Sequence, residues 1–141
     1  MITGKRIHEY LGIRSEDDSL GVYVGFQEID GLHAKTKIGR SKNAAAIQRG
    51  RQQGGANWWF YSYFLLPSNE DTWVVDREMK RHFKSQNIEK TLQNQTELYY
   101  LSPLDATNEL EDLLRSLGYE IRDLVEEILE NDAHKEAGQN P

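Results

Sequence analysis

Two short stretches near the start of the chain carry β-branched and aromatic residues at a period of two. These are residues 21–26 and 34–39, and the Asp30-Gly31 pair between them predicts an antiparallel hairpin. Residues 58–65 are almost continuously aromatic or aliphatic, which predicts a central strand buried on both faces. The pattern therefore predicts a small, mostly antiparallel three-stranded sheet.

Helical patterns around these strands predict an α+β fold in which helices flank the sheet. Ser41 and Asn43 are both candidate N-caps for a helix that begins near residue 44. Residues 69–84 begin with acidic side chains and then place apolar residues on one side, as expected for a second helix. Residues 104–117, with Asp105 as a candidate N-cap, and residues 119–131 predict two further amphipathic helices.

These elements predict four segments along the chain. Residues 1–19 form an N-terminal extension that contributes at most a short helix or strand, and residues 20–102 form the α+β core. Residues 103–132 form an acidic helical hairpin that covers the core, forms a dimer interface or contacts a partner protein. Residues 133–141 are predicted to be disordered.

Composition excludes several kinds of chemistry. The 141 residues include no cysteine, which excludes a disulfide framework, a thiolate zinc site and a thiol nucleophile. No stretch has the apolar length of a signal peptide or a membrane helix. The sequence therefore predicts an intracellular, cytoplasmic protein with no membrane partner.

The net charge of −6 is distributed very unevenly. Residues 103–141 contain 11 acidic and 3 basic side chains, a net −8, so residues 1–102 carry the other 14 basic and 12 acidic side chains, a net +2. Six of these cations fall within 17 residues that include no acidic one: Lys35, Lys37, Arg40, Lys42, Arg49 and Arg51. They predict a phosphate-binding face, and the alternative is an ordinary solvated helix surface.

The residues that suggest a chemical function lie in two triplets, Gly21-Val22-Tyr23 and Lys37-Ile38-Gly39. Followed by arginines on the next predicted helix, they resemble the motifs of the GIY-YIG nuclease family, in particular the phage-type branch that carries KIG in place of YIG. The resemblance covers about residues 20–102. It extends to Glu78 within the predicted second helix and to a glutamate-aromatic segment over residues 96–100.

The resemblance implies a metal-dependent DNA endonuclease with roles for four residues. Tyr23 would contact or deprotonate the attacking water, and Arg49 would neutralise the developing charge, with Arg51 as the alternative arginine. Glu78 would hold one divalent cation, most simply Mg²⁺, with Glu97 as a competing ligand. Lys37 replaces a tyrosine of the family motif, so an ammonium would bind phosphate or orient water there.

Other interpretations of the same residues remain open. Tyr23 is equally suited to packing in a strand, and Glu78 is equally suited to a surface ion pair with Arg81 or His82. Two other functions are also open. One is a catalytically reduced nucleic-acid-binding module on the same fold, and the other is a protein-interaction domain that uses the acidic helices.

Overall fold

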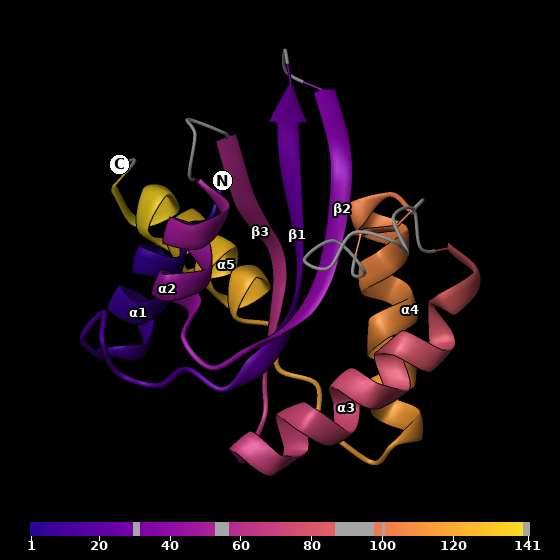
Figure 1. Cartoon of the computed structure of the whole chain (residues 1–141). Coiled ribbons are helices and arrows are strands. Elements are labelled where there is room, and N and C mark those ends of the chain that lie inside the picture. Colours follow the sequence, from indigo (N-terminus) through magenta and orange to yellow (C-terminus); the bar gives the residue numbers. More distant parts are fainter. Residues whose placement is uncertain (30–31, 53–56, 87–97, 100, 140–141) are drawn as a thin grey trace.

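The computed structural model describes residues 1–29, 32–52, 57–86, 98–99 and 101–139 (Figure 1). The elements in this part of the chain, in order, are α1 (Gly4–Leu11), β1 (Gly21–Ile29), β2 (Leu32–Ser41), α2 (Ala44–Arg51), β3 (Asn57–Leu65), α3 (Asn69–His82), a 3₁₀ turn (Lys84–Gln86), β4 (Leu98–Tyr99), α4 (Pro103–Ser116) and α5 (Leu124–Gln139). The predicted α+β class is confirmed. The predicted Asp30-Gly31 turn lies outside the described residues.

The sheet contains three long antiparallel strands and the two-residue strand β4, in the order β3-β1-β2-β4. The predicted hairpin is confirmed, because β1 pairs with β2 from Gly21 opposite Ser41 to Ile29 opposite Leu32. The prediction that residues 58–65 form the central strand is wrong, since β1 lies between β2 and β3. Helices cover both faces of β3, so this outer strand has the continuous apolar sequence expected of a central one.

Alternate residues of each strand pack into two separate cores on the two faces of the sheet. Val22, Val24 and Ile38 pack with apolar residues of α3 and α4. Tyr23 and Tyr63 pack on the other face with residues of α1, α2 and α5. Figure 1 shows this division, with α1, α2 and α5 on one side of the strands and α3 and α4 on the other.

The two C-terminal helices do not form the predicted hairpin. Leu110 and Leu114 of α4 belong to one core, whereas Leu124 and Ile128 of α5 belong to the other. The connection between them crosses the outer edge of β3, where Arg122 C=O accepts a hydrogen bond of 3.3 Å from Leu65 N–H. Pairing with the open strand edge thus separates two helices that are neighbours in the sequence.

Both chain ends are more ordered than the sequence predicts. Ile2 C=O accepts a hydrogen bond of 2.9 Å from Phe60 N–H, and Ile2 and Ile7 are buried in the core. Residues 1–19 are therefore part of the packed fold. The prediction of a disordered segment from residue 133 is also wrong for most of its length, because α5 continues to Gln139.

Side-chain caps explain where most of the helices begin. The side chains of Thr3, Asn43, Ser68 and Ser102 each accept a hydrogen bond from the backbone N–H three residues later, which satisfies donors that the helix cannot pair internally. Ser102, followed by Pro103, is therefore the cap of α4 in place of the predicted Asp105. None of the helices in the described part of the chain has the length and apolarity needed to cross a membrane.

Asp123 anchors the connection between α4 and α5 to β3. Its Oδ1 accepts hydrogen bonds from Tyr63 N–H (2.9 Å) and Val125 N–H (3.1 Å). Burial, with a smaller contribution from the charge of Glu126, raises the pKa of Asp123 to about 6 despite these hydrogen bonds. The folded state therefore binds this proton more tightly than the unfolded state, and the resulting stability falls as the pH rises from about 4 to about 6.

Asp123→Asn should remove this loss because the amide oxygen can accept the same hydrogen bonds without ionising. The unfolding free energy of the variant minus that of the wild type should increase by up to about 3 kcal/mol as the pH rises from about 4 to about 7. It increases because only the wild type loses stability over this range. Urea unfolding of both proteins at several pH values measures this difference. A difference that does not change with pH would show that Asp123 titrates normally in the folded chain.

Candidate functional site

The two triplets lie on neighbouring strands and meet at one pair, Tyr23 with Gly39. Tyr23 is paired with Gly39, and Gly25 is paired with Lys37, so the side chains of Tyr23 and Lys37 are diagonal neighbours on the face that α1, α2 and α5 cover. The prediction that Tyr23 and Ile38 occupy adjacent strands is confirmed. Tyr23 is only 1% exposed, and Lys37 is also buried.

Aromatic packing holds Tyr23 in position. Its ring meets Trp58 and Phe60 edge to face, with centroid distances of 5.8 and 5.4 Å. The indole of Trp58 lies so close to the backbone of Gly25 that a Cβ atom there would be 2.0 Å from it. A glycine is therefore required beside Lys37, because any side chain would displace the ring that packs against Tyr23.

Helix α2 follows β2 directly and presents its residues to the same face. The side chain of Gln48 accepts a hydrogen bond from Gly4 N–H (3.1 Å) and donates one to Trp58 C=O (2.5 Å), which joins α2 to α1 and β3. Arg51, three residues later, is half-buried on the same side of the helix, whereas Arg49 is exposed. Of the two candidate arginines, Arg51 is thus on the side of α2 that packs in the fold.

A buried polar network fixes the junction between β2 and α2. The ring of His8 hydrogen-bonds to Ser19 Oγ (2.9 Å), which also accepts from Ala44 N–H at the start of α2 (2.8 Å). The Tyr63 hydroxyl donates to Ser19 C=O and lies 2.8 Å from Ser41 Oγ. Burial raises the pKa of Tyr63 to about 12, so this phenol is neutral near pH 7.

His8 beside Ser19 resembles the general base and the nucleophile of a hydrolase, but this hydrogen bond has a structural role. Each of the two residues is 2% exposed, so a substrate has no direct access to the serine. Ser19 satisfies a helix N-terminal donor inside the fold, which is otherwise costly to bury. The sequence gives no periodic signal for this network, since its members come from α1, β2, α2, β3 and the connection before β1.

Glu78 lies on α3, which packs on the opposite face of the sheet from Tyr23. Its Oε1 is 3.2 Å from Arg81 Nη1 and 3.9 Å from Arg77 Nε. Glu78 therefore forms the surface ion pair of the alternative interpretation, with Arg81 as its partner. The structure does not bring Glu78 to the face that holds Tyr23 and Lys37.

The side chain of Glu78 is nevertheless 26% exposed, so solvent and ions can reach it. Magnesium takes one or two carboxylates and completes its coordination with waters and phosphate oxygens. Glu78 offers one accessible carboxylate, at which a divalent cation would have to take the place of the Arg81 guanidinium group. Asp76 on the same helix is less suitable, because it is buried and its carboxylate lies 3.0 Å from Lys80 Nζ.

The six clustered cations do not form the single face that the sequence predicts. Arg40 lies on the α3 side of the sheet, where its guanidinium group is 3.5 Å from the centre of the Trp73 ring, while Lys37 is buried on the other side. Lys42 and Arg49 are exposed, and Lys35 and Arg51 are half-buried. The alternation of side chains along β2 separates residues that are close in sequence.

A cationic surface that the sequence analysis missed follows one side of α3. Trp73, which is 54% exposed, lines a shallow hollow of about 600 Å³ together with four cations and Asp76. The cations are Arg77, Lys80, Arg81 and Lys84. Their spacing of three or four residues is the sequence signal that predicts one side of a helix. We call Trp73, these four cations and the adjacent Arg40 the α3 cationic surface.

The glutamate-aromatic segment lies mostly outside the described residues, and this includes Glu97. Leu98 and Tyr99 form β4 and pair with Lys37 and Thr36. The residue that follows Glu97 in the chain is thus the direct partner of Lys37 in the sheet.

Comparison of the chain with protein-family models, curated proteins and solved structures found no match. The functional interpretation therefore depends on the residues themselves and on their geometry.

Proposed function

We propose that the chain is a metal-dependent DNA endonuclease of the GIY-YIG type that hydrolyses phosphodiester bonds. The observation that carries this proposal is the pairing of the two triplets. Tyr23 and Lys37 are diagonal neighbours on one face of adjacent antiparallel strands, and an arginine-bearing helix follows the second strand directly. The family motifs require this arrangement of strand, strand and helix.

The chain's own side chains supply the groups that phosphodiester hydrolysis needs. The Tyr23 hydroxyl contacts the attacking water, and the Lys37 ammonium binds the scissile phosphate. An arginine of α2 neutralises the developing negative charge, and its packed position favours Arg51 over Arg49 in this role. Tyr23 is buried in the core with α1, α2 and α5, and Lys37 is buried as well. Cleavage by these groups therefore requires that the helices over this face move when DNA binds.

Magnesium belongs to the proposal as a cofactor that stabilises charge on the phosphate and on the leaving oxygen. Glu78 is the proposed protein ligand, because its carboxylate is accessible and resembles the metal-binding glutamate of the family motif. The ion would take the place of the Arg81 guanidinium group at this carboxylate. Glu97 is the competing ligand, because the residue after it pairs with Lys37.

The α3 cationic surface supports DNA as the partner. Guanidinium and ammonium groups attract phosphates without regard to base sequence, and Trp73 adds an exposed aromatic ring of the kind on which bases stack. We propose this surface as the principal DNA contact, with Lys35, Lys42, Arg49 and Arg51 as a second contact on the other side of the sheet.

One observation favours a second candidate function, a catalytically reduced nucleic-acid-binding module on the same fold. Tyr23 is buried and Glu78 lies on the opposite face, so the proposed catalytic groups are not assembled in one open cleft. Such a module would bind DNA through the α3 cationic surface and leave it intact.

The DNA contact can be tested with two matched double variants. Arg77→Gln/Lys84→Gln should weaken binding by about tenfold and lower the slope of log affinity against log salt by about two, because two phosphate contacts are lost. Lys42→Gln/Arg49→Gln should have a smaller effect. Fluorescence anisotropy of a labelled duplex at several salt concentrations measures both quantities.

The control for this experiment is Arg115→Gln/Lys135→Gln, which removes the same charge from exposed positions on α4 and α5 and should leave binding unchanged. Equal losses in all three double variants would show that total charge, and not the α3 cationic surface, determines affinity. Deleting residues 103–141 cannot serve as a test, since Leu110, Leu124 and Ile128 are buried in the cores.

The metal ligand can be tested by comparing Glu78→Gln with Glu97→Gln. If Glu78 holds magnesium, Glu78→Gln should lower magnesium-dependent nicking of plasmid DNA by about 100-fold or more while DNA binding and melting temperature persist. Full activity in Glu78→Gln would refute this role for Glu78. Loss of nicking confined to Glu97→Gln would identify Glu97 as the ligand. If neither the variants nor the wild type nicked the plasmid, the binding module would be favoured.

A further inference from the structure

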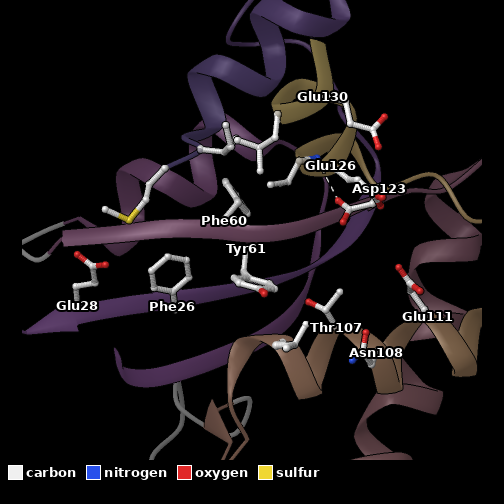
Figure 2. A pocket seen from close by; sticks show the side chains of 15 residues that line it. Phe26, Glu28, Phe60, Tyr61, Thr107, Asn108, Glu111, Asp123, Glu126 and Glu130 are labelled. Atoms are coloured by element: carbon white, nitrogen blue, oxygen red, sulfur yellow. Dashed lines mark hydrogen bonds between the residues drawn. The ribbon is translucent and has the colours of Figure 1, made fainter. Parts of the chain in front are cut away.

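A groove of about 730 Å³ lies between α4 and α5, along the outer edge of β3 (Figure 2). Phe60 and Tyr61 of β3 and Phe26 of β1 contribute to it from the sheet. The groove exists because the connection through Asp123 sends α4 and α5 to opposite faces of the sheet, so that the two helices flank the strand edge without packing against each other along it.

The groove collects most of the large apolar side chains that remain exposed in the described part of the chain. Five such residues are exposed, and three of them line the groove: Met1 (67%), Leu104 (54%) and Leu129 (53%). They come from the N-terminus, α4 and α5, so folding brings them together from distant parts of the sequence. Exposed apolar groups gathered in one place are typical of a surface that binds another molecule.

The charged side chains that line the groove are all acidic: Glu28, Glu111, Asp123, Glu126 and Glu130. Figure 2 shows Glu111 on the α4 side and Glu126 and Glu130 on the α5 side. Glu111 is 3.6 Å from Arg115, whereas within the described residues neither Glu126 nor Glu130 has an ion-pair partner. The groove thus combines an apolar floor with a negative rim.

We infer that this groove binds an amphipathic helix of a partner protein, one with an apolar stripe flanked by lysine or arginine. The apolar stripe would cover Leu104, Leu129 and Met1, and the basic flanks would face Glu126 and Glu130. The same rim repels the phosphates of DNA, so the groove and the α3 cationic surface take partners of opposite charge. The inference does not depend on nuclease activity.

The test uses a fluorescent helical peptide of about 16 residues with leucines on one side and lysines on both flanks, titrated with the full chain and followed by anisotropy. It should bind, and a peptide with the same leucines but glutamate flanks should not. A scrambled lysine peptide of identical composition should bind at least about tenfold more weakly, because its leucines no longer form one stripe.

Protein variants locate the binding surface. Leu129→Ser should weaken binding by about tenfold or more, and Glu126→Gln should weaken it several-fold and reduce its salt dependence. The matched controls are Leu117→Ser, another exposed apolar residue outside the groove, and Glu70→Gln, an exposed carboxylate on α3. Both controls should bind as the wild type does, and all four substitutions are at exposed positions, so each should preserve the melting temperature.

Three results would overturn the inference. Equal binding of the scrambled peptide would show simple charge attraction, and an equal loss in Leu117→Ser would place the contact elsewhere. Self-association of the chain in sedimentation, abolished by Leu129→Ser, would identify the occupant as a second copy of this chain.

Discussion

The pairing of β1 with β2 on one side and β3 on the other is the constraint on which the rest of the structure depends. Once Tyr23 is paired with Gly39 and with Tyr63, side-chain alternation assigns every neighbouring residue to one of two faces. Val22 and Val24 enter the core with α3, and Tyr23 enters the core with α2. The same alternation places Arg40 and Lys37 on opposite faces, which divides the cationic cluster of the sequence into two surfaces.

Both faces of this sheet require cover, and the chain ends provide much of it. The N-terminal segment and the connection before α5 also hydrogen-bond to the outer edge of β3, which protects an edge that would otherwise be open. This arrangement packs α4 and the first part of α5 into the cores, although the composition of residues 103–141 is that of an acidic appendage. It also creates the acidic groove, because α4 and α5 are divided between the two faces.

Local signals in the sequence predicted the parts of the fold that depend on neighbouring residues. The hairpin, the Asn43 cap of α2 and the extent of α3 follow from alternation, capping chemistry and helical periodicity. The strand order, the separation of α4 from α5 and the network around Ser19 depend on contacts between distant residues, for which one sequence carries no periodic signal. The arrangement of the candidate site was likewise predicted in part. Tyr23 and Lys37 come together as neighbours, whereas Glu78 lies on α3, and no local pattern specifies which face of the sheet this helix covers.

We propose that Tyr23 contributes a catalytic hydroxyl as well as a packed ring. Tyr23→Phe separates these roles, since the ring contacts with Trp58 and Phe60 remain and only the oxygen is lost. The most direct measurement is single-turnover nicking of plasmid DNA in magnesium, with melting temperature and DNA affinity measured on the same samples. Tyr23→Phe should lower the nicking rate by about 100-fold or more with little change in affinity or stability. An unchanged nicking rate would show that the hydroxyl has no catalytic role.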